Sequence, residues 1–189
     1  MPQIISDIFA GNPVAGVFVV AMILSLTLPK KVKIEEVGAL TEELLGGMSS
    51  RLFLEVREKR GLAYFVGAER IAAPEAGMFF LCAGTARERA AAALEEMRKE
   101  MRRLRGGRLS AEELLGAKTR LCVALRSGRQ RAASRCGNAA LNALCGLPAD
   151  RDAEAESRIG ALTADDVARF ASETLAGEFS LALTVFPPE

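Results

Sequence analysis

The order of strand-like and helix-like hydrophobic patterns limits this chain to few folds. Four stretches alternate or run apolar as β-strands do: the end of "VAGVFVVAMILSLTL", residues 63–72, residues 77–85, and "FSLALTVF" near the C-terminus. Helical patterns fill the long interval between the third and the fourth. Because strands and helices are segregated, we expect an α+β two-layer sandwich with an antiparallel or mixed sheet covered by helices. We expect residues 1–189 to form a single domain.

Helix boundaries are marked by glycines and by Ser/Thr capping patterns. A helix is predicted over 33–47, and a short one follows in "MSSRLFLEVREKRG". Thr85, Ser110 and Thr163 each begin a capping-box pattern. They predict helices to about residue 105, to about residue 145 with a break near Ser127–Gly128, and to about residue 175.

The uncharged segment from residue 8 to residue 29 has two interpretations. It is just long enough to be a membrane anchor. However, Gly11 and Pro13 interrupt it, no basic region precedes it, and its end alternates with period two. These features favour a buried strand over a membrane span.

The chain has no histidine, which removes Ser-His-Asp hydrolases, Cys-His proteases and self-contained His-ligated metalloenzymes. No metal site is expected in this chain. Its four cysteines form no C-x-x-C pair and lie in apolar surroundings, so they are expected to be buried thiols in a reducing compartment. A cytoplasmic location is expected, with the periplasm as the alternative.

Charge is distributed unevenly although the net charge is only +1. Residues 114–149 carry six basic and no acidic side chains, whereas residues 150–178 carry eight acidic and three basic ones. The simplest interpretation is a basic helix face that the acidic segment neutralises. A docking face for an acidic partner is the alternative. Nucleic acid is not an expected partner, because no aromatic residues are interleaved to stack on bases.

The stretch "REKRGLAYFV" places the only tyrosine of the chain, Tyr64, seven residues after Arg57. Arg57 is predicted in the last turn of the short helix, and Gly61 allows the chain to reverse into a strand. Two hydrogen-bond donors that converge on one point suit a peptide carbonyl or its tetrahedral oxyanion. The alternative is a surface arginine beside a half-buried tyrosine with its hydroxyl in water.

The segment "LLGGMSSRLFLEVREKRGLAYFV" resembles the non-catalytic half of the insulinase/pitrilysin-type zinc peptidases, which include mitochondrial processing peptidase-like bacterial proteins. "AGMFFLCAGT", "LSAEELLGAKTRL" and "LTADDVARFASETL" resemble later parts of the same half-domain. The resemblance covers residues 33–186. Residues 1–30 match poorly beyond supplying a strand.

The resemblance implies a peptidase built from two homologous α+β halves that close around a peptide. One half carries zinc in an H-x-x-E-H motif with a Glu general base. The other supplies an Arg and a Tyr to the substrate, which by position in the motif are Arg57 and Tyr64. Structural roles fall to Gly46, Gly47 and Gly61 at the ends of the short helix, and to Ser49, Ser50 and Arg51 in capping and bracing it.

This chain is therefore not expected to be a protease on its own. It would act as a substrate-binding half of a two-chain zinc endopeptidase, with zinc in a partner chain. The implied partners are a peptide and a His-bearing homologous half-domain in a heterodimer, with a homodimer as the alternative. A catalytically silent structural or assembly protein of the same fold is the alternative function.

Overall fold

The computed structural model describes residues 17–23, 33–72, 77–175 and 180–185. The elements in chain order are β1 (Val17–Ile23), α2 (Lys33–Gly46), the π-turn η1 (Phe53–Glu58), β2 (Phe65–Ala72), β3 (Gly77–Thr85), the 3₁₀ turn η2 (Arg87–Arg89), α3 (Ala90–Arg105), α4 (Ala111–Arg129), α5 (Ala132–Leu144), the 3₁₀ turn η3 (Arg151–Glu154), α6 (Ala155–Ala161), α7 (Ala164–Thr174) and β4 (Ser180–Val185).

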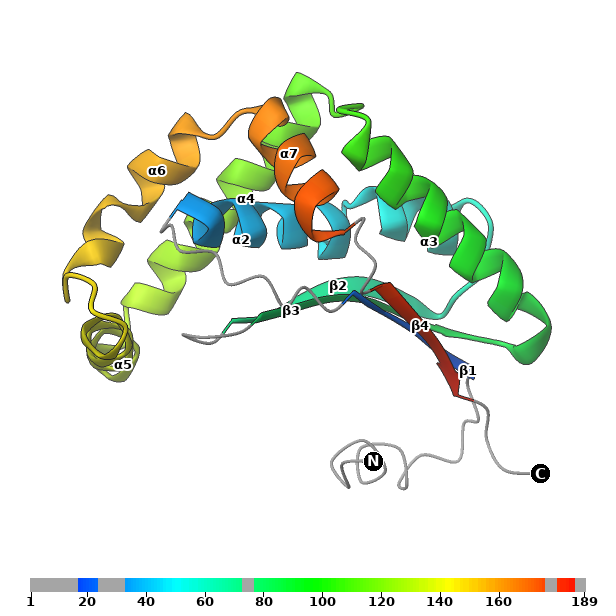
Figure 1. The fold of residues 1–189 in the computed structure, drawn as a ribbon, viewed down its shortest axis with the longest axis horizontal. Helices are drawn as coiled ribbons and strands as arrows, with labels where there is room; N and C mark the ends of the chain where they lie inside the picture. Colours follow the sequence, from blue (N-terminus) through cyan, green and yellow to red (C-terminus); the bar gives the residue numbers. More distant parts are fainter. Residues whose placement is uncertain (1–16, 24–32, 73–76, 176–179, 186–189) are drawn as a thin grey trace.

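The four strands form one antiparallel sheet in the order β2-β3-β1-β4 (Figure 1). β1 pairs with β3 on one side and with β4 on the other, and β2 pairs with β3. The helices gather over one face of this sheet (Figure 1). The predicted α+β two-layer architecture is confirmed.

The core lies between the helices and the covered face of the sheet. Alternate residues of β2 and β3 point into it, because successive strand side chains face opposite sides. Phe79 of β3 packs edge-on against Phe170 of α7, with ring centroids 6.3 Å apart. The predicted apolar stripe of α2 is buried, as are Met97, Met101 and Leu104 of α3. One apolar layer therefore joins helices far apart in sequence to the sheet.

Part of the uncharged segment 8–29 is a strand, since β1 runs from Val17 to Ile23 and is hydrogen-bonded on both sides. The strand interpretation is confirmed there. Residues 8–16 and 24–29 lie outside the described residues. No helix within the described ranges combines the length and the apolar composition needed to cross a bilayer.

Several sequence predictions are wrong in detail. Thr85 does not cap a helix. It is the last residue of β3, and helix α3 begins at Ala90 after the turn η2. The break after α4 falls at Gln130–Arg131 rather than at Ser127–Gly128. The helical segment η3–α6 was not predicted. Cys136 and Cys145 are exposed rather than buried.

The other two capping boxes form as predicted. Ser110 and Thr163 each accept a hydrogen bond from the backbone N–H three residues on, and the acidic side chain at that position reaches back to the backbone N–H of the cap. These boxes fix where α4 and α7 begin. The first turn of α4 matters for the site described below.

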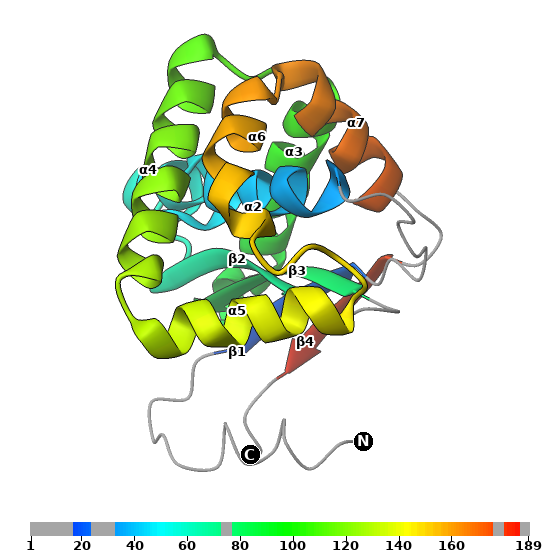
Figure 2. The same ribbon diagram turned by 90° about the vertical axis from the view of Figure 1, so that its left-hand side faces the viewer.

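Two of the basic side chains in residues 114–149 form ion pairs with acidic side chains of other helices. Arg120 binds Glu43 of α2, and Arg126 forms two hydrogen bonds with Glu156 of α6. Lys118, Arg129 and Arg135 donate to backbone carbonyls. Glu156 belongs to the acidic segment 150–178, so one of these pairs is of the kind that the neutralised-face interpretation predicts. Helix α5 follows α4 and extends away from the helix layer (Figure 2), and none of its residues is buried.

Candidate functional site

The hinge between η1 and β2 brings the predicted site residues onto one short segment. Gly61 has φ +57°, a left-handed conformation that glycine adopts without strain. Its N–H donates to Arg57 O (3.0 Å), and Leu62 N–H donates to Val56 O (2.8 Å). Gly61 thus ends the short helix and reverses the chain, as predicted. Arg57 precedes this reversal, and Tyr64 lies just before β2.

Arg57 lies in a π-turn, not in an α-helix. The hydrogen bond from Lys59 N–H to Leu54 O spans five residues, which is the π pattern. The Arg57 guanidinium lies over the Phe53 ring, 4.8 Å from its centroid, and its Nε is 3.7 Å from Glu58 Oε1. Phe53 and Glu58 therefore limit the directions that the Arg57 side chain takes. Single π-turns often occur at functional sites.

Tyr64 has a fixed backbone and an exposed ring. Its N–H donates to Gly84 O of β3 (2.7 Å), whereas its side chain is 70% exposed. Within the described part of the chain, its hydroxyl has no hydrogen-bond partner. No hydrogen bond or ring contact joins Arg57 and Tyr64 within these residues. The two lie on either side of one hinge, and both are exposed.

Two residues that support this hinge were missed by the sequence analysis. The Thr85 hydroxyl donates to Leu62 O, and Arg89 Nη1 donates to Gly61 O (2.6 Å). Thr85 is fully buried. The only sequence signal at Thr85, the capping-box pattern, led to a different role, and nothing in the sequence pointed to Arg89.

The other end of the short helix is set by the glycines and serines of the motif. A Cβ on Gly46 would lie 2.7 Å from Ala68 O, so only glycine lets the end of α2 approach β2 this closely. Gly47 N–H donates to Glu43 O (3.2 Å), which closes α2. Ser50 Oγ accepts a hydrogen bond from Phe53 N–H (3.1 Å) and so caps the helix start. Ser49 lines the neighbouring pocket.

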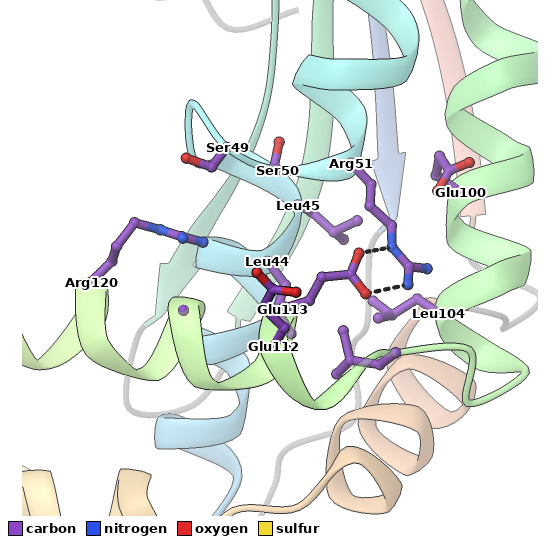
Figure 3. A pocket seen from close by; sticks show the side chains of 12 residues that line it. Leu44, Leu45, Ser49, Ser50, Arg51, Glu100, Leu104, Glu112, Glu113 and Arg120 are labelled. Carbon is purple, nitrogen blue, oxygen red and sulfur yellow. Dashed lines mark hydrogen bonds and ion pairs between the residues drawn. The ribbon is translucent and has the colours of Figure 1, made fainter.

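Arg51 joins the start of the short helix to α4. Its Nη2 donates to Glu113 Oε2 (2.6 Å) and its Nε donates to Glu113 Oε1 (Figure 3). Glu113 Oε2 also accepts from Ser110 N–H (2.9 Å) in the α4 capping box. Hydrogen bonding to Arg51 lowers the pKa of the Glu113 carboxyl from its usual 4.5 to about 2, and the bonds from Ser110 act in the same direction.

The pocket around this ion pair has a volume of about 260 Å³ (Figure 3). Leu44, Leu45, Glu100 and Arg120 help to line it, but Arg57 and Tyr64 do not. Two ion pairs lie in its lining, Arg51 with Glu113 and Arg120 with Glu43. Arg51 Nη1 and Glu100 Oε2 are buried there without a hydrogen-bond partner among the described residues. The pair of Arg51 and Glu113 braces the short helix against α4.

Among the described residues, no side chains are grouped so that they could hold zinc. The chain has no histidine. Over the described residues, no group of three or more Cys, Asp or Glu side chains could hold a metal ion. Glu113, Glu43 and Glu36 are engaged with arginines. The residues present do not fit a zinc site.

A helix-covered antiparallel sheet and a glycine-ended short helix define an α+β domain of one sheet and one helix layer. Comparison with known families agrees with this class. The family described as Peptidase M16 inactive domain matches residues 21–121, which is more than half of the chain. The chain belongs to this family.

Individual relatives are named as zinc proteases or as a peptidase M16 inactive domain. The chain is 32% identical over 146 residues to an uncharacterized zinc protease of Streptomyces coelicolor, covering 77% of this chain and 32% of that protein. It is 40% identical over 76 residues to an uncharacterized zinc protease of Rickettsia felis, covering 40% of this chain and 18% of that protein. The fold is similar to a crystal structure of a peptidase M16 inactive domain from Pseudomonas fluorescens, with a TM-score of 0.80, 21% identity, and coverage of 94% of this chain and 42% of that one. The chain thus spans about a third or less of these two curated relatives.

Proposed function

We propose that this chain is the non-catalytic, substrate-binding half of a zinc-dependent endopeptidase. Its membership in a family of inactive peptidase domains supports this proposal, as does its similarity to a part of longer proteins named zinc proteases. Zinc and the general base would come from a His-bearing homologous half-domain. The active unit would then be a heterodimer with a peptide bound between the two halves.

In this proposal, Arg57 and Tyr64 donate hydrogen bonds to the peptide backbone and to the oxyanion of its tetrahedral intermediate. The observation that carries it is the exposed Tyr64, whose hydroxyl has no partner within the described residues, seven residues after an exposed arginine that lies over the Phe53 ring. Fixed donors at the point where negative charge develops stabilise a transition state strongly. The guanidinium of an arginine offers five N–H donors in a fixed plane.

The test is to mix the chain with a His-bearing homologous half-domain and zinc, and to measure cleavage of fluorogenic peptides. Cleavage should need both chains and should stop with a chelator. Tyr64→Phe and Arg57→Gln should each lower kcat about 10²- to 10³-fold. Arg98→Gln, on the exposed surface of α3, is the matched control and should leave kcat unchanged.

A catalytically silent structural or assembly protein is the competing function. It predicts that no His-bearing partner yields cleavage, or that cleavage persists unchanged in both Tyr64→Phe and Arg57→Gln. Either result would contradict the proposed role of Arg57 and Tyr64 as hydrogen-bond donors to the peptide. A homodimer in solution that excludes the partner would do the same.

A further inference from the structure

The segment from Gly61 to Tyr64 has no regular structure, yet three hydrogen bonds hold its backbone. Gly61 O accepts from Arg89 Nη1 (2.6 Å), Leu62 O accepts from the Thr85 hydroxyl, and Tyr64 N–H donates to Gly84 O (2.7 Å). All three partners lie on the last residues of β3 or on the turn η2 that follows. One end of the sheet therefore fixes the backbone on which the Tyr64 ring is carried.

Two of these bonds come from side chains, so substitution can remove them. Thr85 is fully buried, and a buried hydroxyl without a partner destabilises a fold. Its bond to Leu62 O satisfies the hydroxyl and fixes the residue after the glycine. Arg89 is exposed and fixes the carbonyl of the glycine itself. Because Gly61 has the greatest backbone freedom in the segment, these bonds limit the directions in which Tyr64 can leave the sheet.

We infer that Thr85 and Arg89 are positioning residues for Tyr64. They hold the backbone of the hinge and so limit where the Tyr64 ring can lie. Neither residue need touch the peptide. This inference rests on the proposed function for its consequence in catalysis, but its structural claim concerns this chain alone.

The composition of the chain offers a direct readout. Tyr64 is the only tyrosine and there is no tryptophan, so the intrinsic fluorescence of the full chain reports on this one ring. Time-resolved anisotropy of that fluorescence measures how far the ring and its segment move. A substitution that loosens the hinge lowers the residual anisotropy even when far-UV circular dichroism shows an intact fold.

The variants are Thr85→Val, which keeps the shape and removes the donor, and Arg89→Gln. Both should lower the residual anisotropy of Tyr64. Thr85→Ser, which keeps a hydroxyl, should leave it at the wild-type value. Thr119→Val is the matched control, because the Thr119 hydroxyl bonds within exposed α4. It should leave the anisotropy unchanged. If Thr85→Val does not fold, Arg89→Gln carries the test, since Arg89 lies at the surface.

In the reconstituted pair, Thr85→Val and Arg89→Gln should lower kcat about 10- to 100-fold with a smaller change in KM, as expected when a donor is misplaced rather than removed. Unchanged anisotropy in folded Arg89→Gln and Thr85→Val would overturn the inference. Lowered anisotropy together with an inert Tyr64→Phe substitution would overturn the proposed function and leave the positioning role standing.

Discussion

Arg51 and Glu113 are 62 residues apart in sequence and form a two-point ion pair between the short helix and the first turn of α4. The same carboxylate closes the α4 capping box through Ser110 N–H. One glutamate therefore sets the start of α4 and anchors the helix that carries Arg57.

This ion pair predicts a specific pH dependence. The pKa of Glu113 is lowered to about 2 in the folded chain, so the pair contributes stability above pH 4.5 and loses it as the pH falls toward 2. Glu113→Gln keeps the cap but removes the charge. We expect it to lower the free energy of unfolding by about 1–2 kcal/mol at pH 7, after allowing for partial exposure of the pair.

Urea unfolding followed by circular dichroism across pH 2–7 checks this. The difference between the wild-type chain and Glu113→Gln should shrink below pH 4.5. Glu112→Gln, a substitution at the exposed neighbour, should follow the wild type throughout. Parallel curves for the wild type and Glu113→Gln would show that the pair adds no pH-dependent stability.

Gly46→Ala should separate α2 from the sheet. A Cβ at this position would lie 2.7 Å from Ala68 O and 3.0 Å from Ala68 N, and backbone atoms of β2 cannot move aside easily. We expect a loss of about 2 kcal/mol in the free energy of unfolding. Gly160→Ala in α6 meets no atom within 4 Å and is the control. A Gly46→Ala chain as stable as the wild type would mean that this close approach is not required.

Gly61→Ala should be costly for a different reason. No atom lies within 4 Å of a Cβ there, but the φ of +57° disfavours any L side chain. A loss of about 1–2 kcal/mol is expected, and less for Gly61→Asn. Gly128→Ala, in the last turns of α4 with open space around it, should instead stabilise by up to about 1 kcal/mol. Thermal unfolding should show a lower melting temperature for the two Gly61 variants and a higher one for Gly128→Ala. Shifts of the same sign in all three would refute the conformational argument.

Glu36 of α2 binds two arginines of the segment that sequence analysis missed. Arg151 Nη2 (2.7 Å) and Arg158 Nε (2.6 Å) both donate to Glu36 Oε1, and Glu36 is 7% exposed. Glu36→Ala should cost about 3 kcal/mol, because it leaves buried positive charge without this partner. Glu95→Ala, which removes an exposed pair with Arg102, should lower the urea midpoint far less than Glu36→Ala does. Similar urea midpoints for the two variants would contradict this account.

Local sequence patterns were sufficient to predict the helix starts and the chain reversal that depend on neighbouring residues. Ser110 and Thr163 cap helices as their sequences predict, and Gly61 reverses the chain. The antiparallel pairing of the strands also agrees with the segregated pattern, whereas their order in the sheet was not predicted. At the site, the order of Arg57, Gly61 and Tyr64 along the chain was enough to place them on the two sides of one hinge.

Tertiary contacts decided the rest. Thr85 has a capping sequence, but the β3 ladder continues through it and its hydroxyl is used by Leu62 O. The η3–α6 segment has no apolar stripe, and Glu36 helps to fix it from 115 residues away. Arg89 acts on Gly61 across 28 residues. No local pattern contains such partners, so sequence analysis could not find them.

The π-turn of the short helix has a further consequence. A π-turn holds one residue more than an α-helical turn, so deletion of one residue between Ser50 and Arg57 would let the segment close as an ordinary α-helix. The shortened turn would absorb the loss, and Arg57 would stay on the face of the helix that it has now. The same deletion in a regular α-helix would instead rotate every later side chain by about 100° around the helix axis.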